Sequence, residues 1–205
     1  MLVGCSSTTF AINNAYSDIA SGLANTVLVI NPEISTPFVN YAKRDIHFIF
    51  GDGCVATVIS NNKKSNNQYK ILDRKLITKF SNNIRSDWSY LVRAASDEKS
   101  IEDLLFYQNG NSVFKEVCPM VAEFITTHLK DNNISPSDVS KFWLHQANSR
   151  MVNLIVSKVI GTDDFDTSLA PLPIEKFGNL ASAGSMFAFN LHNDLEKGDK
   201  GCLLY

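Results

Sequence analysis

The sequence lacks a strong excess of charge of either sign. Its 205 residues carry 19 basic and 21 acidic side chains, which gives a formal net charge of −2. Such a balance creates no global field that would attract nucleic acid or an anionic membrane surface. The sequence also lacks any apolar run that approaches the roughly 18 residues of a membrane-spanning helix. We therefore expect neither a nucleic acid nor a membrane as a partner.

Cysteine is sparse, and its spacing does not match the common metal sites. The four cysteines lie far apart, with no CxxC pair and no Cys/His spacing of a zinc site: Cys5, Cys54, Cys118 and Cys202. The first residues run directly into a polar cluster and do not form a signal-peptide pattern. We therefore expect free thiols, a cytoplasmic location and no metal.

The composition, 44% hydrophobic and 20% charged, is that of an ordinary globular protein. Strand-like and helix-like patterns alternate, which predicts an α/β fold with a mostly parallel sheet. Strands are expected at 26–30, 55–59, 69–78, 142–144 and 202–205, and helices at 6–20, 112–130, 151–160 and 181–196. The continuous apolar run at 26–30 predicts a strand buried on both faces. The polar stretch 61–68 divides the chain into two predicted units, 1–60 and 69–205.

One short pattern occurs twice. Gly4-Cys5 precedes a helix rich in small residues, a Ser-Gly pair and a strand, whereas Gly178-Asn179 precedes a similar helix, a Lys-Gly pair and a strand. This weak repeat suggests two related halves, with Cys5 and Asn179 at matching helix starts.

Three side chains are candidates for chemistry. Cys5 follows a glycine at a predicted helix start, where unpaired N–H groups and the helix dipole favour a thiolate. His145 follows the strand 142–144, at the end of a strand where open α/β sheets place their active sites. Asn179 lies on a turn before a helix. Each also has a structural interpretation, as a buried cysteine, a core histidine or an N-cap, and the residues alone leave a hydrolase and an acyltransferase open.

The motifs around these residues narrow the choice. They are GCSSTTFAINNA, VLVINPE, HFIFGDG, NGNSVFKEV, FWLHQAN and FGNLASAGSMFAFN. With them, the chain resembles the ketoacyl-ACP synthase III group of the thiolase superfamily over essentially its whole length, in the branch with a Cys-His-Asn triad. The stretches DIHFIFGDG and WLHQANSRM resemble most a subgroup that takes medium-chain acyl-CoA primers. The implied thiolase-like α/β fold is incomplete, comprising the end of the first half and most of the second half without its last strand.

The resemblance implies a decarboxylating Claisen condensation in fatty acid or related biosynthesis. Cys5 would take an acyl group from acyl-CoA, and malonyl-ACP would lose carbon dioxide to give the attacking carbanion. His145 and Asn179 would donate hydrogen bonds to the malonyl thioester oxygen, a stabilisation typically worth about 3 kcal/mol per donor. A neutral imidazole suits this role. The resemblance implies no cofactor besides the coenzyme A and phosphopantetheine thioesters themselves.

Substrate-binding residues are implied by the same motifs. Arg44 matches an arginine that contacts the CoA nucleotide. The other matches line a pantetheine tunnel and its basic rim: Asn111, Phe114, Ala147, Asn148 and Arg150. Arg150 and Lys115 are also candidates for contact with the acidic surface of an acyl carrier protein. The full-length family is expected to form homodimers through the sheet edge near 27–30.

The chain is shorter than the family it resembles. It starts four residues before Cys5 and ends at Tyr205, where the family continues into a glycine-rich loop and a last strand. We expect a fragment of a longer product with little condensing activity alone; a remnant reading frame and one piece of a split enzyme are the alternatives. The alternative function is a non-catalytic subunit that binds acyl groups or carrier protein with a partner chain. A cysteine hydrolase ranks third.

Overall fold

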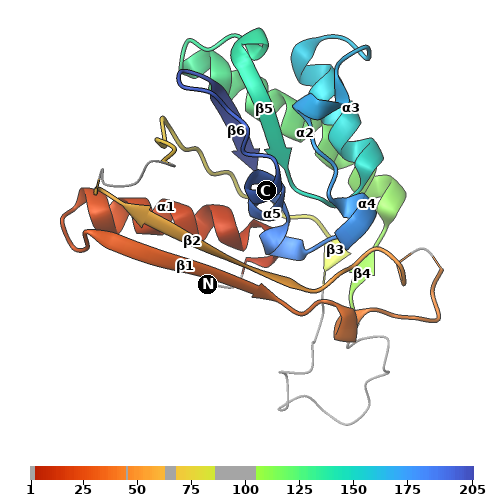
Figure 1. Cartoon of the computed structure of the whole chain (residues 1–205). Coiled ribbons are helices and arrows are strands. Elements are labelled where there is room, and N and C mark those ends of the chain that lie inside the picture. Colours follow the sequence, from red (N-terminus) through yellow and green to blue (C-terminus); the bar gives the residue numbers. More distant parts are fainter. Residues whose placement is uncertain (1–2, 45, 63–67, 86–104) are drawn as a thin grey trace.

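The computed structural model describes residues 3–44, 46–62, 68–85 and 105–205. In chain order the elements are η1 (Gly4–Ser6), α1 (Ser7–Ala20), β1 (Thr26–Glu33), η2 (Thr36–Phe38), β2 (Gly53–Ser60), β3 (Ile84–Arg85), β4 (Tyr107–Gln108), α2 (Gly110–Asp131), η4 (Pro136–Asp138), β5 (Val139–Leu144), α3 (Ser149–Ile160), η5 (Thr167–Leu169), α4 (Ile174–Phe177), η6 (Ala181–Ala183), α5 (Gly184–Leu191) and β6 (Lys200–Leu204). Figure 1 shows α1, β1 and β2 on one side of the molecule and β5, β6, α2 and α3 on the other, with α5 between them.

The first group consists of α1 packed on the ribbon formed by β1 and β2. The two strands pair antiparallel, with Leu28 opposite Val58 and Ile30 opposite Ala56. Val29 faces α1 and is buried, whereas Leu28, Ile30 and Val58 on the other face are 57%, 55% and 67% exposed. The prediction that 26–30 is buried on both faces is therefore wrong for this chain, because the described residues place a helix on one face only.

The second group contains the main hydrophobic core. β5 pairs parallel with β6, and the buried Phe142 and Leu144 of β5 pack with apolar side chains of α2 and α3. Gly201 on β6 has to be glycine, because a Cβ there would lie 2.1 Å from a carbon of the Trp143 ring. At its far end, α3 stops at Gly161, whose φ of +83° is accessible to glycine at little cost.

Two predictions about the sheet are wrong. The strands are not mostly parallel: β1 with β2 and β3 with β4 pair antiparallel. The described residues between β1 and β2 form only the short η2, without the helical crossover that parallel neighbours need. Residues 69–78 form no strand. Instead, this segment is bound to helices through side chains: the Arg74 guanidinium lies 3.7 Å from the centre of the Tyr16 ring of α1, and Lys75 Nζ lies 2.7 Å from Asp131 Oδ2 of α2.

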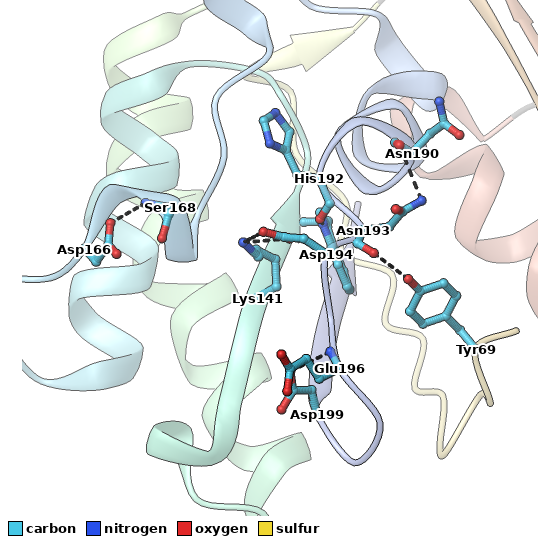
Figure 2. Close-up of polar contacts among 11 residues, drawn as sticks. Tyr69, Lys141, Asp166, Ser168, Asn190, His192, Asn193, Asp194, Glu196 and Asp199 are labelled. Atoms are coloured by element: carbon cyan, nitrogen blue, oxygen red, sulfur yellow. Dashed lines mark hydrogen bonds and ion pairs between the residues drawn. The ribbon is translucent and has the colours of Figure 1, made fainter. Parts of the chain in front are cut away.

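The helix predicted at 181–196 is shorter, because polar contacts redirect the chain after α5. Figure 2 shows Asp194 pointing toward the buried Lys141 of β5, at an N–O distance of 2.9 Å. The neighbouring Asn193 carbonyl accepts a hydrogen bond of 2.6 Å from the Tyr69 hydroxyl. The two predicted units, 1–60 and 69–205, stay a prediction, and part of the polar stretch between them, 63–67, lies outside the described residues.

Candidate active site

Cys5 lies in the middle of η1, the single turn that leads into α1. Gly4 has a φ of +62°, which starts this turn in the left-handed region that favours glycine. The Ser7 hydroxyl fixes the turn by donating to the Gly4 carbonyl at 2.7 Å and accepting from the Val3 N–H at 3.2 Å. The Gly-Cys-Ser-Ser sequence therefore holds the thiol at the start of the helix, as the sequence predicted.

The electrostatic expectation for this thiol is wrong. The pKa of Cys5 is raised to about 11, first by burial and then by the Glu33 carboxylate, while a backbone hydrogen bond lowers it by less than either raises it. Desolvation of the thiolate outweighs the helix start because charge is costly to remove from water. Without substrate, Cys5 is therefore a neutral thiol at neutral pH.

Asn179 is held by the backbone at the start of the FGDG motif, residues 50–53, and by the preceding residue Ile49. Its N–H donates to the Ile49 carbonyl at 2.7 Å and its carbonyl accepts from the Gly51 N–H at 3.1 Å. The two segments approach so closely that a Cβ on Gly51 would lie 2.0 Å from the carbonyl oxygen of Phe177. The side-chain Oδ1 of Asn179 accepts from the Ala181 N–H at 2.9 Å. Its amide NH₂ is consequently the group that can donate to a ligand.

His145 follows β5 in a loop that Gln146 fixes. The buried Gln146 side chain donates to the Leu144 carbonyl at 2.9 Å and accepts from the Ile174 N–H at 3.3 Å. The His145 ring centre lies 6.2 Å from that of Tyr205. Within the described ranges, the buried His145 Nδ1 has no hydrogen-bond partner. Burial lowers the pKa of His145 to about 4, so the imidazole is neutral at neutral pH.

The three candidate residues converge on one short segment, Asn179–Gly184. η6 in this segment contacts η1, α1 and β1, and the Thr8 hydroxyl of α1 donates to the Ser182 carbonyl. On the other side, the Cβ position of Gly184 lies 3.3 Å from the Gln146 Cβ. The turn with Cys5 and the loop with His145 therefore flank the segment that begins with Asn179. Their roles in catalysis stay a prediction.

The implied substrate-binding residues lie on several elements. Arg44 is exposed on the connection between β1 and β2, and Asn111, also exposed, lies in the first turn of α2. Phe106, which directly precedes β4, contacts Phe50 of the FGDG motif, and their ring centres are 5.2 Å apart.

The remaining four residues lie in the loop after His145 or in the helices of the second group. Phe114 packs against the core, Ala147 is half-buried and Arg150 is exposed. Asn148 is exposed and has a structural function as the N-cap of α3, because its Oδ1 accepts from the Arg150 N–H at 2.8 Å. Substrate contact by these residues stays a prediction.

Sequence reasoning missed two side chains near the site. Glu33, at the end of β1, and the buried Ser182 of η6 are hydrogen-bonded to each other across 149 positions of sequence. Both lie inside stretches that matched the family, VLVINPE and FGNLASAGSMFAFN, but no spacing rule distinguishes them from their neighbours.

Comparison with known proteins agrees with the motifs. The family described as 3-oxoacyl-[acyl-carrier-protein] synthase III matches residues 1–79, and its C-terminal counterpart matches 129–204. A β-ketodecanoyl-[acyl-carrier-protein] synthase of Pseudomonas aeruginosa is 44% identical over 99% of this chain and 59% of its own length. A β-ketoacyl-[acyl-carrier-protein] synthase III of Campylobacter jejuni subsp. doylei is 29% identical over 91% of this chain and 54% of its own length. The chain thus spans between half and two thirds of these relatives.

Solved structures agree on the fold. A 3-oxoacyl-[acyl-carrier-protein] synthase III from Aquifex aeolicus superposes with a TM-score of 0.78, at 23% identity over 99% of this chain and 63% of that one. A synthase III from Pseudomonas aeruginosa superposes with a TM-score of 0.80, at 18% identity over 97% and 60%. The thiolase-like α/β fold is confirmed. The chain belongs to the 3-oxoacyl-[acyl-carrier-protein] synthase III family.

The described residues contain neither a cluster suited to a metal ion nor a membrane-spanning helix. No group of three or more His, Cys, Asp or Glu side chains in these ranges is arranged to hold a metal ion. None of the helices in the described part of the chain is both long and apolar enough to cross a membrane.

Proposed function

We propose that this chain carries the active site of an acyltransferase that condenses an acyl-CoA primer with malonyl-ACP in fatty acid or related biosynthesis. The observation that carries this proposal is the convergence of the turn with Cys5, the loop with His145 and Asn179 on the segment Asn179–Gly184. A thiol and two neutral hydrogen-bond donors, carried by elements that meet at one segment, suit thioester chemistry, in which an acyl group is stored and an enolate is stabilised.

The proposed reaction has two half-reactions. Cys5 Sγ attacks the acyl-CoA carbonyl, the C–S bond to coenzyme A breaks, and the thiol proton ends on the departing coenzyme A. Malonyl-ACP then loses carbon dioxide, and His145 and Asn179 donate hydrogen bonds to the thioester oxygen as it gains charge. The carbanion attacks the acyl carbonyl on Cys5, and the C–S bond breaks to release 3-oxoacyl-ACP. Cys5 leaves as a thiolate and takes up a proton from solvent, which restores the neutral thiol. The low pKa of His145 keeps its imidazole neutral, so its N–H donates a hydrogen bond to the thioester oxygen and retains its proton.

A medium-chain primer is part of the proposal. The relative at 44% identity is named for a β-ketodecanoyl product, which corresponds to an octanoyl primer extended by the two carbons of a malonyl unit. No cofactor besides the thioester substrates is proposed. Arg44, Asn111, Phe114, Ala147, Asn148 and Arg150 are the residues proposed to bind the coenzyme A and phosphopantetheine portions.

Assembly and location are proposed from the sheet and the thiols. Among the described residues β1 pairs with β2 alone, so its other edge offers the N–H and C=O groups that a second copy needs for a homodimer. The four cysteines are free, which fits the reducing cytoplasm.

One observation favours the second candidate, a subunit that binds acyl groups or carrier protein together with a partner chain. The outer face of β1 and β2 exposes Leu28, Ile30 and Val58, and adjacent exposed apolar side chains are typical of a surface that another polypeptide covers. Under this alternative, a purified hetero-oligomer would form without acylation of Cys5.

The test is a two-stage assay of the chain with octanoyl-CoA and radiolabelled malonyl-ACP. We expect slow formation of labelled 3-oxoacyl-ACP by the wild type and none by Cys5→Ala. His145→Ala and Asn179→Ala should accept the acyl group normally but lose about 10²-fold in the condensation stage, the typical effect of removing one such donor. Product formation by Cys5→Ala at the wild-type rate would overturn the proposal.

A further inference from the structure

A hydrogen-bonded cluster links the two ends of the active site. The Glu33 carboxylate at the end of β1 accepts from both the N–H and the hydroxyl of Ser182, with the N–O distance 3.2 Å. The same hydroxyl accepts from the Asn31 side chain at 3.3 Å, and the Ser182 carbonyl accepts from the Thr8 hydroxyl. Ser182, Thr8 and Asn31 are all buried.

The cluster joins the elements that carry Cys5 and Asn179. Thr8 lies in the first turn of α1, three residues after Cys5, and Ser182 lies three residues after Asn179. Glu33 lies opposite Gly53 in the β1–β2 register, so it is also next to the FGDG motif that holds the Asn179 backbone. Because every donor and acceptor of Ser182 is bound, the segment can shift only if several buried hydrogen bonds break together.

We propose that Glu33 is a positioning residue, which through Ser182 fixes the Asn179 segment against the turn of Cys5 and keeps a negative charge beside the nucleophile. This inference rests on the proposed function, in which Cys5 is the acyl-accepting residue. The charge has a chemical purpose in that scheme. It disfavours a free thiolate before substrate binds.

The charge effect is specific to Glu33 among the neighbouring groups. The pKa of Cys5 is raised by burial and then by the Glu33 carboxylate. η6 contributes no titratable side chain, and α1 contributes Tyr16 and Asp18, which lie in its last turns. Tyr205, which bonds Thr8, has its pKa raised to about 12 by burial, so it is uncharged at neutral pH and begins to ionise only at the upper end of the Cys5 titration.

The test uses two readouts that need no enzymatic turnover. The first is the pH dependence of Cys5 alkylation by iodoacetamide, measured on the Cys5 peptide, with the exposed Cys54 as an internal reference. The second is hydrogen–deuterium exchange of the peptide 178–187, with a peptide of α3 as a reference for folding. The variants are Glu33→Gln, Glu33→Ala and the control Glu175→Gln, which removes an exposed carboxylate from α4.

The two substitutions of Glu33 separate charge from position. Glu33→Gln retains an oxygen that accepts from Ser182, so we expect unchanged exchange in 178–187 and a Cys5 alkylation midpoint lowered by about 0.5–1 pH unit. Glu33→Ala should lower the midpoint and also speed exchange of 178–187 about tenfold or more, with the α3 peptide unchanged. Glu175→Gln and the Cys54 reference should match the wild type.

Clear results would overturn the proposal. An unchanged Cys5 midpoint in Glu33→Gln would refute the charge effect, and wild-type exchange of 178–187 in a folded Glu33→Ala would refute the positioning role. If Glu33→Ala does not fold, exchange of 178–187 in Ser182→Ala replaces it as the positioning test. The proposed function fails separately, if octanoyl-CoA does not acylate Cys5 in the wild type.

Discussion

Gly51→Ala tests the contact between the FGDG motif and the Asn179 segment. An added Cβ would lie 2.0 Å from the Phe177 carbonyl oxygen and 3.2 Å from its carbon. Both are backbone atoms, so no side-chain rotation relieves the overlap. The two segments must separate, which strains or breaks the hydrogen bonds of Asn179 with Ile49 and Gly51, now 2.7 and 3.1 Å long.

The expected cost follows from these contacts. Overpacking of a tight interior contact costs about 1–3 kcal/mol, and the loss of one backbone hydrogen bond adds about 1 kcal/mol. We therefore expect Gly51→Ala to lower the free energy of unfolding by about 2–4 kcal/mol, measured by urea unfolding followed by circular dichroism. Because Asn179 moves with the segment that contains Phe177, condensation should fall while acylation of Cys5 is retained.

The matched control is Gly110→Ala, at the start of α2. A Cβ there meets nothing within 4 Å, so replacement of a helical glycine should leave stability unchanged or raise it by up to about 1 kcal/mol. If Gly51→Ala unfolds at the same urea concentration as Gly110→Ala, the close approach described above is incorrect.

Three further predictions concern the second group of elements. Burial lowers the pKa of His145 from 6.5 to about 4, so the stability that neutral His145 contributes is complete above about pH 6.5 and is lost as the pH falls toward 4. Between about pH 7.5 and 4.5, the free energy of unfolding of the wild type should therefore fall by about 2.5 kcal/mol more than that of His145→Gln. Equal losses for the two proteins in urea unfolding would disprove this. Asn148→Ala should destabilise the chain by about 1 kcal/mol through loss of the α3 N-cap, whereas Asn153→Ala, on the exposed side of the same helix, should cost less in thermal unfolding. Asp194→Asn removes the carboxylate that is paired with Lys141, whose side chain is only 9% exposed (Figure 2). We expect it to lower the free energy of unfolding by about 1–2 kcal/mol. The double variant with Lys141→Met should recover most of that stability.

Local patterns predicted the elements whose causes are local. The apolar stripe of α2 and the Gly161 stop of α3 gave helices close to those observed, Gly110–Asp131 and Ser149–Ile160. The repeat also corresponds to structure, because η1, α1 and β1 follow one another as do η6, α5 and β6.

The errors concern interactions between distant segments. The direction of β2 relative to β1 depends on the loop that joins them, and the irregular course of 69–78 depends on helices on both sides of it, as with Arg74 on α1 and Lys75 on α2. The pKa of Cys5 illustrates the same limit. A helix start is visible in the sequence, whereas the burial and the Glu33 charge that outweigh it come from residues brought together by folding.

Incubation of the chain with octanoyl-CoA, followed by peptide mass spectrometry of all four cysteines, tests the central claim most directly. If solvent exposure alone determined which cysteine reacts, the acyl group would be found on the exposed Cys54. If Cys5 is the nucleophile of an active site, the acyl group should be found on Cys5, although it is only half-exposed. We predict an octanoyl thioester on Cys5, none on Cys54, and none anywhere in Cys5→Ala. Acylation of Cys54 in preference to Cys5, or equal acylation of the wild type and Cys5→Ala, would contradict the assignment of the active site.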